Sequence, residues 1–289
     1  MLEEKNAAVN APASDSGAKP VNPNKALWEK GDFTRIAATM RQSGEELILS
    51  LGIKPGTKVL DLGSGDGTTA IPAARRGADV LGVDIASNLV HAGNNRAQEA
   101  GLYNVRFVEG DASNLEGLAD HSFDLVVSIF GAMFAPRPFD TAREMVRVTK
   151  PGGRIVMGNW IPGDPTMVAE TLRISAAYTP PPAPGFISPM TWGDEAQVRE
   201  RFEAAGIAPE NIEFERATWY FRQTGTPSDL VETFRRYYGP AMNAFAAAEK
   251  VGETDKLARE LNELFESQNR GGAQTEIPAT YLKVSIKKG

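Results

Sequence analysis

Short apolar runs alternate with helical patterns along the middle of the chain. Apolar runs bounded by glycine or proline are typical of buried strands, whereas apolar positions three and four residues apart are typical of helices. The pattern predicts strands at 58–62, 79–83, 105–109, 123–130 and 154–159, with helices at 68–76, 88–100 and 140–148. Strands that alternate with helices in this way imply a mostly parallel sheet with helices on both faces. We therefore expect a single Rossmann-like α/β domain over residues 25–289.

The chain on either side of this region has different patterns. One or two short helices are expected near residues 25–37, and another over 44–50. The later half predicts helices at 197–205, 228–238 and 255–268, and strands at 212–222 and 280–287. Two long connections, 161–192 and 227–268, remain beyond what a minimal domain needs, and long connections in compact domains are usually functional. We expect both to cap a substrate site.

Composition narrows the classes of function. The net charge is −6 and no long basic run is present, which disfavours a polynucleotide substrate. The chain has no cysteine and only two histidines, so thiolate or histidine-rich metal sites are not expected, although an oxygen-ligand magnesium site stays open. We expect no metal in the site and leave the oligomeric state open.

The expected cellular compartment is based on two features that the sequence lacks, an apolar membrane-spanning run and a signal peptide. No apolar run approaches the roughly 18–20 residues that span a bilayer. Residues 1–24 are polar, carry Glu3 and Glu4, and lack the apolar core of a signal peptide, so they are interpreted as a disordered leader. A cytoplasmic protein without a membrane span is the expectation.

The most informative segment is VLDLGSGDG, residues 59–67. A strand ends after Asp61, and a loop with glycine at every second position opens the next helix. Glycine lets a backbone turn tightly and approach a ligand closely. The next strand ends at Asp84, where a carboxylate can accept both hydroxyls of a ribose. Because ligands of open α/β sheets bind at the carboxyl ends of the strands, this loop predicts a nucleotide-like cofactor.

Two cofactors compete for this loop. A dinucleotide fingerprint needs a third glycine at position 68, where this chain has Thr68, and its glycine falls at Gly67 instead. The pattern D-x-G-x-G-x-G resembles motif I of the class I S-adenosylmethionine (SAM)-dependent methyltransferases. The resemblance continues through EGDA (109–112), F-D-x-V from Phe123, and EMVRVTKPGG (144–153), and covers roughly residues 25–159.

The resemblance implies a sheet of order 3-2-1-4-5-7-6 and a set of residues that bind SAM. It places Asp84 on the ribose and Asp111 on the adenine amino group, and it makes Trp28 and Phe33 part of a cap over the cofactor. The implied cofactor-binding residues are Trp28, Phe33, Asp61, Gly63, Ser64, Gly65, Asp84, Ile85, Asp111, Ala112, Ser128 and Phe130. From the residues alone, Asp111 could equally be a helix N-cap, and Trp28 and Phe33 could be simple packing.

Within that superfamily the sequence most resembles the small-molecule branch that includes the ubiquinone and menaquinone methyltransferases. The segments KALWEKGDF (25–33) and MFAP (133–136) are similar to uncharacterised bacterial members. Nucleic-acid amino-methyltransferases carry N/D/S-P-P-Y/F after the fourth strand, where this chain has Ser128-Ile129-Phe130-Gly131. We expect methyl transfer from SAM to a small, partly apolar acceptor, with no general base that the sequence identifies. An NAD-dependent oxidoreductase and a non-catalytic SAM-binding protein are the alternatives.

Overall fold

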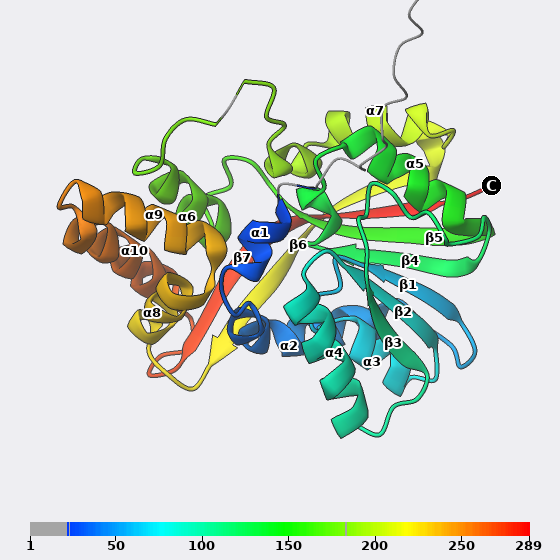
Figure 1. The fold of residues 1–289 in the computed structure, drawn as a ribbon, viewed down its shortest axis with the longest axis horizontal. Coiled ribbons are helices and arrows are strands. Elements are labelled where there is room, and N and C mark those ends of the chain that lie inside the picture. Colours follow the sequence, from blue (N-terminus) through cyan, green and yellow to red (C-terminus); the bar gives the residue numbers. More distant parts are fainter. Residues whose placement is uncertain (1–21, 23, 183) are drawn as a thin grey trace, which may run out of the picture.

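Seven strands form one sheet in the order β3-β2-β1-β4-β5-β7-β6, as the resemblance predicts (Figure 1). The computed structural model describes residues 22, 24–182 and 184–289. The strands are β1 (Lys58–Leu62), β2 (Asp79–Asp84), β3 (Val105–Glu109), β4 (Phe123–Ile129), β5 (Thr149–Trp160), β6 (Ile212–Gln223) and β7 (Thr275–Lys287). The first five are parallel, and β7 runs antiparallel to both β5 and β6. The sheet therefore brings the carboxyl ends of β1 to β5 to one edge.

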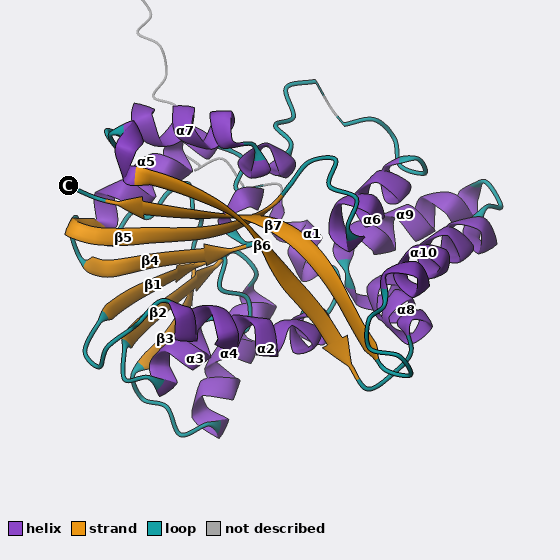
Figure 2. Ribbon diagram, turned by 180° about the vertical axis from the view of Figure 1, so that it is seen from behind, coloured by secondary structure: helices purple, strands orange, loops and turns teal. Residues whose placement is uncertain are grey.

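Helices cover both faces of the sheet (Figures 1 and 2). One face carries α2 (Thr34–Ser50), α3 (Ala70–Arg75) and α4 (Ser87–Glu99), and the other carries α5 (Pro138–Val148) and α7 (Glu195–Ala204). The short helix α1 (Asn24–Glu29) lies at the carboxyl edge of the strands, near the 3₁₀ turn η1 (Ala132–Phe134). The central strands β1 and β4 are almost wholly buried, which explains their continuous apolar sequence.

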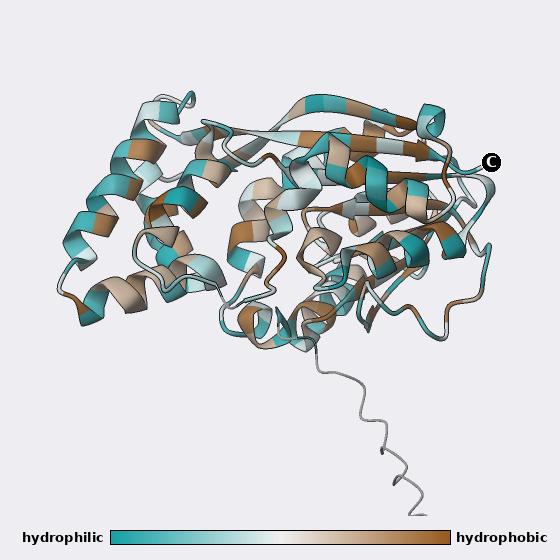
Figure 3. Cartoon of the chain, turned by 90° about the horizontal axis from the view of Figure 1, so that it is seen from above, coloured by the Kyte–Doolittle hydropathy of each residue, from teal (hydrophilic) through white to brown (hydrophobic). Residues whose placement is uncertain are grey.

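A separate group of helices packs beside the far ends of β6 and β7 (Figure 2). It consists of α6 (Met167–Ala176), α8 (Pro227–Tyr237), α9 (Gly239–Lys250) and α10 (Thr254–Gln268). Figure 3 shows hydrophilic and hydrophobic bands alternating along these helices, as expected for amphipathic helices that bury one face. Two further 3₁₀ turns are η2 (Pro189–Gly193) and η3 (Pro209–Asn211).

The structure contains two helices that the sequence pattern did not predict. α9 begins at Gly239-Pro240, in the range between the helices predicted at 228–238 and 255–268. Proline in the first helical turn is favourable, because its missing N–H would have no partner there, and the alanines that follow favour a helix. α6 lies inside the proline-rich connection 161–192, where Met167, Val168 and Ile174 are buried. At the start of the domain, the short helices expected over 25–37 and 44–50 are the short helix α1 and one long helix, α2, which runs through the gap between the two expected ranges.

The predicted leader lies mostly outside the described residues. Its last positions, Asn22 and Asn24, are described, and α1 begins at Asn24, one residue before the expected start of order. Within the described ranges, no helix is both long and apolar enough to cross a membrane.

Candidate functional site

A cavity opens where the carboxyl ends of β1, β2 and β4 meet α1 and α2. Ten of the twelve predicted site residues line it: Trp28, Phe33, Gly63, Ser64, Gly65, Asp84, Ile85, Asp111, Ala112 and Phe130. The other two lie behind the lining. Ser128 is buried, donates to the Leu62 carbonyl (2.7 Å) and accepts from the Ala132 amide (2.9 Å), so it joins the loops after β1 and β4.

The glycine loop approaches the loop after β4 so closely that side chains are excluded at the contact. Gly63 has a φ of +65°, and a Cβ built on it would lie 2.4 Å from the Gly131 Cα. Gly65 also has a positive φ, of +54°, but a Cβ there would meet nothing within 4 Å. One glycine is therefore required by neighbouring backbone, while the other faces open space beside the cavity.

The carboxylate of Asp84 organises the same loop. Its Oδ2 accepts from the Gly65 amide (2.8 Å), and its Oδ1 accepts from the Ala86 amide (2.9 Å). Burial raises the pKa of Asp84, although the backbone hydrogen bonds lower it in part. Each carboxylate oxygen has two lone pairs, so each can accept one further hydrogen bond from a ligand.

Two arginines on neighbouring helices hold the loop in place, although no sequence pattern pointed to them. The buried carboxylate of Asp66 pairs with both terminal nitrogens of Arg41 on α2, one of them at 2.9 Å. Arg96 on α4 donates to the Asp66 carbonyl oxygen. Buried carboxylates are stable only when they are paired, so these contacts fix the loop relative to α2 and α4.

Asp61 lies one layer below the loop. Its Oδ2 accepts from the Thr69 hydroxyl (2.5 Å), and its Oδ1 has no hydrogen-bond partner among the described residues. Burial raises the pKa of Asp61 to about 7, against the hydrogen bond from Thr69, which lowers it. Asp61 does not line the cavity, whereas Gly63, Ser64 and Gly65 of the loop that follows it do.

The raised pKa predicts a stability effect for Asp61→Asn. The Asp61 carboxyl keeps its proton up to about pH 7 in the folded chain, whereas in the unfolded chain it releases the proton above the ordinary pKa of 3.8. The unfolding free energy of the wild type therefore falls between about pH 4 and about pH 7 and is constant above pH 7. The asparagine variant lacks this fall. At about 1.4 kcal/mol per pKa unit, the unfolding free energy of the variant relative to wild type should rise by about 2 kcal/mol between pH 5 and pH 7, because Asp61 is already about half ionised at pH 7.

Chemical denaturation at pH 5, 6, 7 and 8 measures this difference. Asp79→Asn, at an exposed carboxyl at the start of β2, is the matched control and should show no such growth. A difference between Asp61→Asn and wild type that is the same at every pH would contradict the interpretation.

The loop after β3 carries Asp111 at the other end of the cavity. Asp111 Oδ1 accepts from the amide (2.8 Å) and hydroxyl (2.7 Å) of Ser113, and its Oδ2 accepts from Asn22 (3.2 Å). The residues that follow form turns, so the alternative of a helix N-cap is wrong. Asp111 keeps this loop folded and also lines the cavity.

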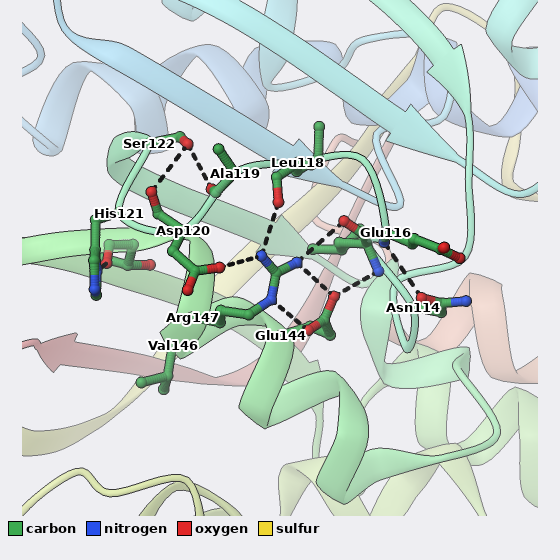
Figure 4. A network of polar contacts seen from close by, with 12 residues as sticks. Asn114, Glu116, Leu118, Ala119, Asp120, His121, Ser122, Glu144, Val146 and Arg147 are labelled. Carbon is green, nitrogen blue, oxygen red and sulfur yellow. Dashed lines mark hydrogen bonds and ion pairs between the residues drawn. The ribbon is translucent and has the colours of Figure 1, made fainter.

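Arg147 on α5 ties down the rest of that loop (Figure 4). It donates to the Leu118 carbonyl (2.7 Å), to Asp120 (2.7 Å) and to Glu144 (2.7 Å). Arg147 lowers the pKa of Glu144, which also accepts from the Leu115 amide at 2.7 Å. The loop after β3 is therefore held by α5 even though it contains no helix of its own.

The N-terminal segment closes one side of the cavity. Trp28 packs edge-on against Phe33 (5.5 Å between ring centroids) and Phe134 (4.8 Å). Polar contacts hold α1 in place: Lys25 pairs with Glu109, and Glu29 accepts from the Ser87 hydroxyl at 2.8 Å. Trp28 and Phe33 therefore pack against neighbouring rings and also line the cavity. Simple packing and a place in a cap over the cofactor are thus compatible interpretations of these two residues.

The far end of the cavity is apolar and includes residues that the sequence did not single out. Met40 comes from α2 and Trp219 from β6, and they face the same cavity as Phe130. Phe130 has a φ of +58°, which is rare for a bulky residue, and its ring stacks on Trp160 at 3.6 Å. Strain of this kind persists where surrounding contacts hold it, and it gathers at functional sites.

Neither long connection contributes a described lining residue. Tyr238, after α8, packs on Trp28 and Phe33 from outside (6.3 Å to each ring), and η2 lies beside η1. The two segments therefore support the wall from behind, and capping of a substrate by them stays a prediction. Among the described residues, no group of three or more acidic or histidine side chains could hold a metal ion.

Comparison with known proteins gives three kinds of similarity. The Methyltransf_11 family, described as a methyltransferase domain, matches residues 60–157. An uncharacterized protein of Mycobacterium tuberculosis is 34% identical over 239 residues, which cover 82% of this chain and 84% of the relative. The demethylmenaquinone methyltransferase of Paenarthrobacter aurescens is 39% identical over 111 residues, covering 38% of this chain and 42% of that protein.

The fold also matches solved structures. The phosphoethanolamine N-methyltransferase 2 of Haemonchus contortus, solved in complex with S-adenosyl-L-methionine, superposes with a TM-score of 0.59 at 17% identity. That match covers 93% of this chain and 61% of the solved chain.

Proposed function

This chain belongs to the class I SAM-dependent methyltransferases, and we propose that it transfers the methyl group of SAM to a small, partly apolar acceptor. The Asp84 carboxylate, which holds the Gly65 amide inside a cavity with an apolar far end, is the observation that supports this function most directly. One end of the cavity suits a nucleoside and the other suits an organic acceptor.

The residues present fit the adenosyl part of SAM. Asp84 keeps an accepting lone pair on each oxygen, which suits the two hydroxyls of a ribose. The Ser64 hydroxyl is buried at the cavity wall without a partner among the described residues, and open space lies beside Gly65. We assign Ile85, Asp111 and Ala112 to the adenine end, because they follow β2 and β3 at the same edge.

Bound SAM supplies a methyl group on a positively charged sulfur, which a nucleophile of the acceptor displaces in line. The protein's share is to align the two partners and to exclude water, and orientation alone is worth about 7–11 kcal/mol. Trp28 and Phe33 shield one side of the cavity, and Phe130 is fixed on the other by its stacking on Trp160.

Three observations support a small, partly apolar acceptor. Met40, Phe130 and Trp219 give the far end an apolar lining, as in small-molecule sites. The net charge of −6 is unsuited to a polynucleotide. A relative that matches part of the chain is named for a quinone acceptor, demethylmenaquinone. We also propose that residues 161–192 and 227–268 cap the substrate at this end of the site.

Binding and turnover measurements test the function. Calorimetry should show saturable binding of SAM and of S-adenosylhomocysteine, and no binding of NAD. Incubation with SAM and a panel of small phenols, hydroquinones and amines should release S-adenosylhomocysteine, whereas a protein that only binds SAM would release none. Binding of NAD without S-adenosylhomocysteine would overturn the cofactor assignment, and methylation of RNA or DNA alone would overturn the acceptor class.

A further inference from the structure

Helix α1 lies between the α/β core and the group of helices α6, α8, α9 and α10 (Figure 1). It packs on α4 of the core on one side and on α9 of the helix group on the other. α1 has only six residues, and none of them is buried. A helix of this length is not stable by itself in water, so its place depends on the contacts that it makes with its neighbours.

The contacts of α1 with the core combine a ring contact with polar groups that are partly exposed. Trp28 packs on Phe134, as described above. Lys25 pairs with Glu109, and these two side chains are 33% and 47% exposed. Ion pairs at such exposure stabilise little, so much of what holds α1 must come from its other side.

That other side meets the corner between α8 and α9, which we define as residues 237–239. A Cβ built on Gly31, just after α1, would lie 2.4 Å from the Tyr237 carbonyl oxygen. A Cβ built on Gly239 would lie 2.7 Å from the Leu27 carbonyl oxygen. Neither glycine has a positive φ, so close approach of the two backbones, rather than turn geometry, requires a residue without a side chain.

Tyr238, at the centre of the corner, packs behind two residues of the cavity wall. Its ring centroid lies 6.3 Å from those of Trp28 and Phe33, and 5.1 Å from that of Phe234 on α8. Trp28 and Phe33 line the cavity, whereas Tyr238 does not. The corner therefore fixes the two rings from the side opposite the ligand.

We propose that the α8–α9 corner holds α1 closed over the bound cofactor, and that Tyr238 is the positioning residue for Trp28 and Phe33. The inference rests on the proposed use of SAM, and it extends the role of residues 227–268 from the acceptor to the cofactor. S-adenosylhomocysteine leaves when the wall formed by Trp28 and Phe33 moves aside, so the corner sets the rate of product release.

Gly239→Ala tests the backbone contact. Its methyl group would meet the Leu27 carbonyl oxygen at 2.7 Å, so α1 and the corner must move apart. S-adenosylhomocysteine should then dissociate about tenfold faster, the size expected for the loss of one aromatic contact, and its affinity should fall by the same factor. Stopped-flow kinetics measures the rate, calorimetry measures the affinity, and a melting curve verifies folding.

Gly153→Ala is the matched control. Gly153 also lacks a positive φ, and a Cβ on it would lie 2.9 Å from the Lys150 carbonyl oxygen, but it lies near the start of β5, at the opposite edge of the sheet. This variant should lose stability and keep the wild-type dissociation rate. A wild-type rate in folded Gly239→Ala, or the same change of rate in both variants, would overturn the proposal.

Variants of Tyr238 test the ring contacts, and they decide the question alone if Gly239→Ala does not fold. Tyr238→Phe keeps the ring and should release S-adenosylhomocysteine at the wild-type rate, whereas Tyr238→Ala should release it about tenfold faster. Phe245→Ala is the control, because Phe245 on α9 is equally buried but does not line the cavity. It should lose stability only. Equal acceleration in Tyr238→Ala and Phe245→Ala would show that the corner merely stabilises the fold, which contradicts the proposal.

These outcomes are distinguishable from failure of the proposed function. A wild-type protein that does not bind S-adenosylhomocysteine would refute the proposed function and this inference with it. Binding by wild type, together with unchanged release from folded Gly239→Ala and Tyr238→Ala, would refute only the role of the corner.

Discussion

Replacing Asp84 with alanine is expected to weaken S-adenosylhomocysteine binding by at least about 100-fold, because two hydrogen bonds to a charged acceptor are lost at about 1.5 kcal/mol or more each. The variant also frees the Gly65 and Ala86 amides, so the glycine loop loses its anchor. Calorimetry at constant pH measures the affinity, and a melting curve verifies that the variant is folded.

Asp84→Asn is the matched variant for this test. An amide keeps the shape of the side chain and one accepting oxygen, but it loses the charge and one acceptor. Its affinity should fall between that of wild type and that of Asp84→Ala. If the folded alanine variant bound S-adenosylhomocysteine within tenfold of wild type, Asp84 would not hold the ribose, and the assignment of the site would be wrong.

The second large effect is expected for Gly63→Ala. The new methyl group would lie 2.4 Å from the Gly131 Cα, in backbone that cannot move aside cheaply, and the residue would sit at a φ of +65°. The left-handed conformation costs roughly 1–2 kcal/mol and overpacking typically another 1–3 kcal/mol, so the variant should lose about 2–5 kcal/mol of unfolding free energy.

Gly65→Ala separates the two contributions. Its φ is similarly positive, but the added methyl group meets nothing within 4 Å, so only the conformational cost of roughly 1–2 kcal/mol is expected. Urea denaturation compares the two variants. Because the methyl group of Gly65→Ala occupies space beside the cavity, this variant should fold yet bind S-adenosylhomocysteine more weakly. Equal losses of stability in both variants would show that contact with Gly131 is not what requires a glycine at position 63.

Both alternatives drawn from the sequence, an NAD-dependent oxidoreductase and a non-catalytic SAM-binding protein, are now disfavoured. The glycine at position 67 rather than 68 already disfavoured a dinucleotide, and membership of the methyltransferase family agrees with that reading. A protein that binds SAM without catalysis is disfavoured by the same membership. Release of S-adenosylhomocysteine in the presence of an acceptor is the measurement that distinguishes it from an enzyme.

The sequence alone determined the parallel core and the end of the cavity that the glycine loop and Asp84 line. The strands β1 and β3 have the bounds that the apolar runs predicted, and the strand order agrees with the resemblance. Gly63, Gly65 and Asp84 could be located because a strand, its terminal carboxylate and the following loop are adjacent in the chain. Parallel strands then bring such loops to one edge without further information.

Only the tertiary structure decided the far end of the cavity. Met40, Phe130 and Trp219 come together from α2, the loop after β4 and β6, although they are separated by some ninety residues or more in the sequence. It also placed Asp61 and Ser128 behind the wall and stabilised α6, whose proline-rich surroundings hid its buried face. Local patterns record which face of an element is apolar, but the partner of that face depends on packing between distant segments, which no local pattern contains.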